Sequence, residues 1–175
     1  METISFWIKS LRVIPQVSKE EWVTLDIISR WLVASRSAVF IMTALSCTIG
    51  GILAYSYTGY FNLTNFVVCL FGLIFAHAAN NLVNDLIDFR RGIDNDNYYR
   101  TLYGPQVIKG GYLSMSAFNR YIITTLLMAS LCGLFLVLRT DIITLYLMAA
   151  GALFLFFYTW PLKYIGLGEL TVVIV

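Results

Sequence analysis

The stretch 65-NFVVCLFGLIFAHAA-79 runs directly into 80-NNLVNDLIDFRRGID-94. The first stretch has no Asp, Glu, Lys or Arg, whereas the second has three Asp and two Arg. Over the whole chain, 59% of the residues are hydrophobic and 13% are charged, while a soluble domain has about 45–50% apolar residues. Since a helix of about 20 apolar residues crosses the hydrocarbon of a bilayer, the change of composition at residue 80 predicts a transmembrane helix that ends in a polar cluster.

Uncharged runs of this length recur along the chain. No Asp, Glu, Lys or Arg lies between Arg36 and Asp85, an interval that holds two spans. We expect spans near residues 37–57, 64–86, 118–138 and 141–160. The apolar residues 170–175 are too few to cross and would begin a fifth span, so we expect the chain to be the N-terminal part of a larger bundle. The predicted fold class is an all-α, polytopic transmembrane helix bundle with four complete spans and the start of a fifth.

The basic residues predict the orientation of the chain. Only Arg139 falls in the connection between the third and fourth spans, and all the other Lys and Arg fall on the opposite side. By the positive-inside rule, the N-terminus and the polar cluster face the cytoplasm, and we expect the bacterial cytoplasmic membrane. Residues 1–36, which carry charges throughout and several Trp, are expected to form a cytoplasmic or interfacial segment ahead of a membrane domain at 37–175. A partly disordered tail is the alternative.

The polar cluster forms a stripe on its helix. At about 100° per residue, the side chains of His77, Asn81, Asn84, Asp85 and Asp88 fall within an arc of roughly 100°. An ionisable side chain costs about 2.5–3.5 kcal/mol at the centre of a membrane, so the stripe should face the bundle interior or a wet cavity. Two carboxylates one turn apart suit Mg²⁺, which is usually held by one or two carboxylates together with substrate phosphates.

The connection that follows the stripe is basic. Arg90, Arg91, Arg100 and Lys109 lie within 25 residues of the two aspartates. A diphosphate bridged by a metal ion fits this mixture of charges, whereas a cation channel would carry acidic rings without so many arginines. The alternative is a structural one, in which the aspartates and arginines only pair with each other at the membrane surface. The net charge of +2 is too small to indicate a nucleic acid partner.

The motif 84-NDLIDFRRGID-94 resembles the first aspartate-rich motif of the UbiA-type intramembrane prenyltransferases, which is N-D-x-x-D followed by a third Asp. The third acid here is Asp94, where the commonest form of the motif would place it at Gly92. This longer spacing, together with 104-GPQVIKGGYLS-114 and 158-YTWPLKYIGLGELTV-172, is similar to the branch that prenylates 1,4-dihydroxy-2-naphthoate in menaquinone synthesis. The resemblance covers about residues 30–175.

The resemblance implies a bundle of about nine spans around a central cavity in the lipid bilayer. Its members bind a polyprenyl diphosphate through Mg²⁺, ionise it to an allylic carbocation and let an aromatic acceptor attack. The developing charge on the diphosphate is stabilised by metal ions and fixed cations, and the carbocation by aromatic faces in a dry cavity.

Carried over by position, the resemblance assigns roles to individual residues. The implied metal ligands are Asp85, Asp88, Asn84 and Asp94. The implied diphosphate-binding residues are Asn81, Asn84, Arg100 and Lys109. The implied catalytic residues are Asp85, Asp88, Tyr158 and Lys163.

The chain departs from the family pattern in one respect. The second aspartate motif of the family, which binds another Mg²⁺ from a later span, does not occur before Val175. We therefore expect residues 1–175 to hold half of the active site and not to catalyse alone. The expected function is Mg²⁺-dependent transfer of a polyprenyl group to an aromatic acceptor, with 1,4-dihydroxy-2-naphthoate as the leading acceptor. The alternatives are another acceptor (4-hydroxybenzoate, a chlorin, haem or a glycerol phosphate lipid) and a truncated, non-catalytic membrane protein that binds isoprenoids.

Overall fold

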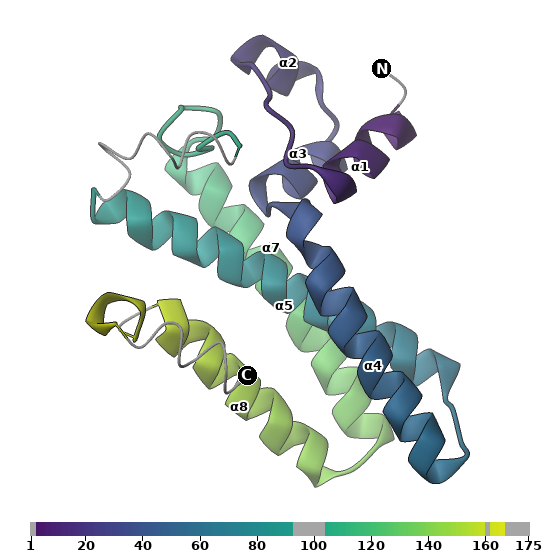
Figure 1. The fold of residues 1–175 in the computed structure, drawn as a ribbon. Coiled ribbons are helices and arrows are strands. Elements are labelled where there is room, and N and C mark those ends of the chain that lie inside the picture. The colour runs from purple at the N-terminus through teal and green to yellow at the C-terminus, as the bar shows by residue number, and fades with distance from the viewer. Residues whose placement is uncertain (1–2, 93–103, 160–161, 167–175) are drawn as a thin grey trace.

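The computed structural model describes residues 3–92, 104–159 and 162–166 (Figure 1). Within these residues every regular element is a helix, which confirms the all-α prediction. The helices, in chain order, are α1 (Thr3–Arg12), α2 (Lys19–Thr24), α3 (Ile27–Ala34), the 3-10 helix η1 (Ser37–Val39), α4 (Phe40–Thr58), α5 (Leu63–Arg90), α7 (Met115–Arg139), α8 (Ile142–Thr159) and the 3-10 helix η3 (Leu162–Ile165).

Three helical stretches are long and apolar enough to cross a membrane, and they are Ser37–Thr58, Leu63–Arg90 and Met115–Arg139. They confirm the first three predicted spans. The fourth predicted span is α8, which counts as a shorter apolar helix over its described part, Ile142–Leu155. The fold is therefore a membrane helix bundle. Residues 170–175, where we expected a fifth span to begin, lie outside the described residues.

The turn between α4 and α5 follows directly from its sequence. Gly59 ends α4 with a φ of 66°, a conformation that glycine adopts without steric cost, and its N–H donates to the carbonyl of Tyr55 over 2.8 Å. Asn62 then caps α5, because its side-chain oxygen accepts a hydrogen bond from the N–H of Asn65. Two long helices are thus joined as a hairpin by the four residues 59–62.

The helix α5 is central to the bundle, since it packs against α4, α7 and α8. The α4–α5 and α7–α8 turns lie at one end of the molecule, and α1, α2 and α3 gather at the other (Figure 1). The C-terminal part of α5 and the segment that leads into α7 lie at that second end as well. The polar stripe of α5 is therefore placed beside the N-terminal helices.

The main core of the described residues lies at this same end. It joins the N-terminal segment, α5, α7 and the segment before α7, and its buried members are Phe6, Val17, Trp22, Val33, Ala34, Leu82, Val107, Phe118 and Ile122. The rings of Trp22 and Tyr112 meet edge to face with their centroids 5.5 Å apart. The hydroxyl of Tyr112 also donates to the carbonyl of Val17 over 2.8 Å. The N-terminal segment is thus attached firmly to the connection between α5 and α7.

Residues 3–34 contain three short helices, of which α2 and α3 have side-chain N-caps. Ser18 and Glu21 form a reciprocal capping box at the start of α2. Asp26 caps α3 by accepting hydrogen bonds from the N–H groups of Ile28 and Ser29. A hydrogen bond from the hydroxyl of Ser29 is the main reason that the pKa of Asp26 lies below its ordinary value. These contacts support the helical expectation for the N-terminal segment over the disordered one.

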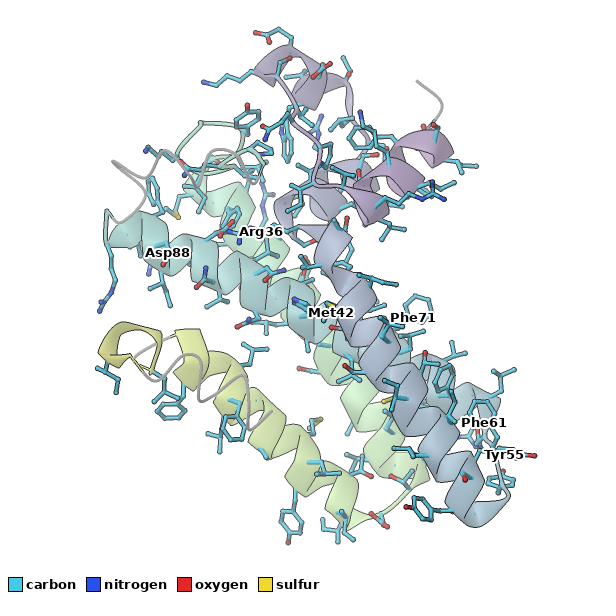
Figure 2. All side chains as sticks on the ribbon, in the orientation of Figure 1. Arg36, Met42, Tyr55, Phe61, Phe71 and Asp88 are labelled. Carbon is cyan, nitrogen blue, oxygen red and sulfur yellow. The ribbon has the colours of Figure 1, made fainter. Side chains whose placement is uncertain are left out.

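The long helices expose most of their apolar surface. Met42, Tyr55 and Phe71 project outward from α4 and α5 (Figure 2), with exposed fractions of 65%, 56% and 51%. Only 11–17% of the most apolar window of each long helix is buried inside the protein. A surface of this kind is stable against lipid chains and not against water.

We predict that Leu82→Ala destabilises the protein far more than Leu138→Ala. Leu82 is fully buried where α5 meets α7, so its truncation leaves a cavity worth about 2–5 kcal/mol. Leu138 is 77% exposed on α7, so its truncation should change the free energy of unfolding by no more than about 0.5 kcal/mol. Unfolding by sodium dodecyl sulfate in mixed micelles, followed by circular dichroism, measures both. Equal losses in the two variants would contradict the placement of the core.

Candidate functional site

The five residues of the polar stripe all lie on α5, and three of them contact α4 or the junction between α3 and α4. The Nδ1 atom of His77 is 2.7 Å from the hydroxyl of Thr43. The amide nitrogen of Asn81 donates to the carbonyl of Ser35 over 2.9 Å. Asp85 forms an ion pair with Arg36. The stripe therefore faces protein rather than lipid, as its polarity predicts.

The Arg36–Asp85 ion pair is largely shielded from solvent. The side chains are 22% and 12% exposed, respectively. A carboxylate so far from water needs a compensating charge, because burial otherwise favours its neutral form. Arg36 supplies this charge from the junction that leads into α4.

Arg36 has an unusual backbone conformation. Its φ and ψ are 57° and 52°, and it is the one non-glycine residue with a positive φ among those the structure describes. Such a conformation costs about 1–3 kcal/mol and persists only where the surroundings impose it. The buried neighbours do this here, because the hydroxyl of Ser35 donates to the carbonyl of Trp31 (2.7 Å) and that of Ser37 to the carbonyl of Ser10 (2.8 Å).

The next turn of α5 carries the second aspartate of the motif. Asp88 is 5% exposed, and its Oδ2 accepts a hydrogen bond from the amide nitrogen of Asn84 over 3.0 Å. Asn84 uses its amide nitrogen in this hydrogen bond. The oxygen of the same amide is an acceptor that can bind a cation. The arrangement supplies two carboxylates and an amide oxygen within one turn of helix.

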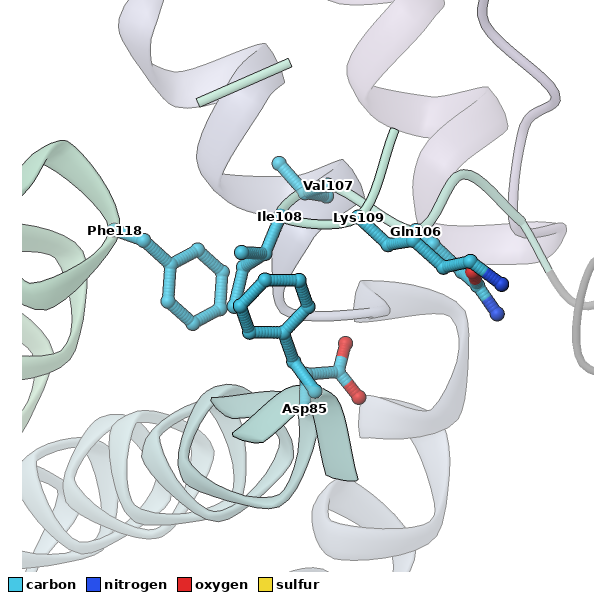
Figure 3. A pocket seen from close by; sticks show the side chains of 7 residues that line it. Asp85, Gln106, Val107, Ile108, Lys109 and Phe118 are labelled. Atoms are coloured by element: carbon cyan, nitrogen blue, oxygen red, sulfur yellow. The ribbon is translucent and has the colours of Figure 1, made fainter. Parts of the chain in front are cut away.

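A small pocket lies beside Asp85. It is lined by Asp85 and Phe89 from α5, Phe118 from α7, and residues 106–109. Figure 3 shows Asp85 below the loop that carries Val107, Ile108 and Lys109. The pocket thus brings an acidic and a basic residue of the predicted site together.

The loop over the pocket is held by its own backbone. The N–H of Gly110 donates to the carbonyl of Gln106 over 2.7 Å, and that of Tyr112 to the carbonyl of Val107 over 3.0 Å. This turn places Gln106 and Lys109 at the pocket. The Nε2 atom of Gln106 is buried and has no hydrogen-bond partner in the part of the chain that the structure describes, so it offers an N–H donor to an anion.

The donor set fits a magnesium ion that is shared with phosphate. Among the described residues, no three His, Cys, Asp or Glu side chains gather to hold a metal, so a full protein cage is absent there. Magnesium does not need one, because one or two carboxylates and substrate phosphates normally hold it. Asp85 and Asp88 with the amide oxygen of Asn84 provide this smaller set.

The remaining predicted residues are placed only in part. Asp94 and Arg100 lie outside the described residues. Tyr158 belongs to the last turn of α8 and Lys163 to η3, and their side chains also lie outside what the structure describes. Because α7 runs away from the stripe and α8 returns, the end of α8 comes back toward the side of the bundle on which α5 ends (Figure 1).

From the sequence, Arg36 served only to bound the first uncharged interval and to orient the chain, and Gln106 had no predicted role. A signal for Arg36 was present: Arg36 and Asp85 are consecutive charged residues that bound an uncharged pair of spans. An even number of spans returns the chain to the same membrane face, where opposite charges can meet. Gln106 offered no such signal, since a single amide in a loop has no preferred partner.

We predict that Asn81→Ala lowers the free energy of unfolding by about 1–3 kcal/mol, because the carbonyl of Ser35 loses its donor in a buried place. The same detergent unfolding titration measures this loss. If the role of Asn81 is structural, the free energy of unfolding falls by the same amount with and without magnesium and diphosphate. A loss seen only in their presence would instead make Asn81 a ligand-binding residue.

In a comparison with known protein families, residues 44–175 of the chain match the UbiA prenyltransferase family. A protein of Danio rerio named UbiA prenyltransferase domain-containing protein 1 is 26% identical over 162 residues, which are 91% of this chain and 48% of the relative. The protein of the same name from Xenopus tropicalis is 35% identical over 65 residues, which are 37% of this chain and 19% of the relative. The chain thus spans about half the length, or less, of these curated relatives.

No solved structure matches the chain significantly. The relatives' names state no acceptor, and their vertebrate origin lends no support to a bacterial membrane. The family match nevertheless covers most of the sequence and contains the whole α5 stripe. This chain belongs to the UbiA prenyltransferase family.

Proposed function

We propose that the C-terminal part of α5 is the first metal and diphosphate site of a magnesium-dependent prenyltransferase. Family membership supports prenyl transfer in general. The observation that carries the site is the pocket in which Asp85 lies beside Lys109, one helical turn from the buried Asp88. A carboxylate and a cation in one pocket, with a second carboxylate one turn along the same helix, suit a diphosphate bound through a metal ion.

In this proposal the residues of the stripe hold the donor substrate. Asp85, Asp88 and Asn84 would bind magnesium, and Asp94 would join them from the adjoining segment. When bound, magnesium stabilises the negative charge that develops on the leaving diphosphate. Lys109 stabilises the same charge directly, and Gln106 donates a hydrogen bond to it. By family resemblance, Arg100, Tyr158 and Lys163 approach the diphosphate from the other segments.

The side of the pocket next to Asp85 is apolar, which suits the reacting end of a prenyl group. Phe89 and Phe118 line the pocket next to Asp85. Aromatic faces stabilise a neighbouring cation, and exclusion of water protects a carbocation from hydrolysis. The site therefore combines an anion-binding side and an apolar side, which is the arrangement that ionisation of an allylic diphosphate requires.

The proposed acceptor is 1,4-dihydroxy-2-naphthoate, which would place the reaction in menaquinone synthesis. The support is the spacing from Asp88 to Asp94 and the segment 104-GPQVIKGGYLS-114. 4-Hydroxybenzoate, a chlorin, haem and a glycerol phosphate lipid are the competing acceptors. A panel of these acceptors, each supplied with the same polyprenyl diphosphate, distinguishes them by which one gains the prenyl group.

We predict that Asp85→Asn and Asp88→Asn each lower the rate of prenyl transfer at least about 10²-fold, because each removes a charge that holds the metal and the diphosphate. Chelation of magnesium should abolish transfer in the unchanged protein. The measurement is formation of prenylated acceptor in membranes that contain residues 1–175 within a complete prenyltransferase domain. Asp141→Asn is the matched control, since Asp141 is exposed and belongs to the α7–α8 turn, which lies at the opposite end of the bundle from α1, α2 and α3 (Figure 1).

Unchanged turnover in Asp85→Asn would overturn the site assignment. Magnesium-dependent binding of polyprenyl diphosphate without any product, in every acceptor tested, would favour the non-catalytic isoprenoid-binding alternative.

The proposed orientation places residues 1–36 and the aspartate motif on the cytoplasmic side. We predict that, after replacement of the three native cysteines by alanine, a membrane-impermeant maleimide labels Glu20→Cys only when it reaches the cytoplasmic face. Tyr60→Cys, in the α4–α5 turn, should react only from the opposite face. Both positions are exposed. Labelling of intact and of opened cells, read by mass shift, measures this. The reversed pattern would show the opposite orientation.

A further inference from the structure

The side chain of Arg36 binds the same carboxylate that the proposed function gives to magnesium. Arg36 pairs with Oδ1 of Asp85, and neither side chain is more than about a fifth exposed. A metal ion on the same carboxylate would lie close to the guanidinium, and two positive charges this close repel each other strongly in a largely buried place. A divalent cation on Asp85 therefore competes with Arg36.

The position of Arg36 lets its side chain move while its backbone stays fixed. The backbone is held by the buried hydroxyls of Ser35 and Ser37 and by the hydrogen bond from Asn81 to the carbonyl of Ser35. The side chain beyond Cβ is long and has several rotatable bonds. It can leave Asp85 without displacing α4 and still remain beside the pocket that Asp85 lines.

The charges around the pocket favour binding of a cation and an anion together. A divalent cation alone would add positive charge next to Arg36 and Lys109, and a diphosphate alone would add negative charge next to Asp85 and Asp88. Like charges brought into a partly buried site are strongly unfavourable. When both bind, the cation takes Asp85 and the diphosphate offers oxygens to the released guanidinium, which matches their geometry.

We propose that Arg36 is the counter-cation of Asp85 and transfers to the diphosphate when a divalent cation takes that carboxylate, so that cation and diphosphate bind cooperatively. This inference rests on the proposed function, because it takes Asp85 as a metal ligand. It gives a role in the site to a residue that precedes the family match at 44–175. The segment before α4 thereby becomes part of the substrate-binding machinery.

The test measures binding of Mn²⁺, a paramagnetic substitute for Mg²⁺, by the loss of its free electron paramagnetic resonance signal. The full chain is titrated in detergent with and without inorganic diphosphate. In the unchanged protein, saturating diphosphate should raise the affinity for Mn²⁺ at least about 10-fold. In Arg36→Gln, Mn²⁺ alone should bind about 3-fold or more tighter, and the enhancement by diphosphate should fall below about 3-fold.

Three further variants complete the experiment. Arg120→Gln removes an exposed arginine on α7 and should behave like the unchanged protein. Arg36→Lys keeps the charge but loses the planar fork, so it should shift Mn²⁺ affinity in the same direction as Gln by a smaller factor. Arg36→Lys replaces Arg36→Gln in the test if the Gln variant does not fold, as judged by helix content and elution volume. Asp85→Asn should abolish the diphosphate-dependent binding.

The outcomes separate the inference from the proposed function. If Asp85→Asn leaves Mn²⁺ binding unchanged, Asp85 is not a metal ligand and the proposed site itself fails. If Asp85→Asn abolishes binding while both Arg36 variants keep the affinity and the enhancement of the unchanged protein, the site stands and the transfer of Arg36 is overturned. A shift of equal size in Arg120→Gln would also overturn it, because any nearby arginine would then have the same effect.

Discussion

A carboxylate at the edge of a membrane must be compensated, and the structure satisfies this constraint at Asp85 through Arg36. This ion pair constrains how the neighbouring helices pack. It requires α4 and α5 to form a hairpin that brings both charges to one face, and it requires the α3–α4 junction to pack on α5. This geometry requires a strained, left-handed backbone at Arg36, which the hydrogen-bonded, buried hydroxyls of Ser35 and Ser37 hold in place.

The sequence predicted the spans well because charge distribution follows the membrane closely. Each of the four predicted spans corresponds to a helix, and periodicity alone placed the stripe on the helix face that meets the protein. The predicted end of α5 was less accurate, since the helix continues to Arg90. Charged residues mark where the hydrocarbon ends, and a helix passes that boundary freely because Asp, Leu, Ile and Arg side chains are all compatible with helical backbone at an interface.

The partners within the site were beyond sequence reasoning for a different reason. The sequence predicts Asn81 and Asn84 as diphosphate-binding residues, but it does not predict their partners within the protein, which are the carbonyl of Ser35 for Asn81 and Asp88 for Asn84. An amide can donate to any nearby acceptor, so its partner depends on which backbone or carboxylate the tertiary fold brings close. The same holds for Gln106, whose position at the pocket depends on the turn formed by residues 106–112.

The N-terminal segment has a larger part in the site than the family match alone indicates. The match begins at residue 44, after α1, α2, α3 and the junction that carries Arg36. Trp22 and Val33 nevertheless belong to the same buried core as Leu82 and Phe118, and the hydroxyl of Thr125 on α7 accepts a hydrogen bond from Trp31 over 2.9 Å. Helices that share one core with the aspartate-bearing turn of α5 cannot shift without moving Asp85. The geometry of the motif is therefore set by residues on both sides of the point at which the family match begins.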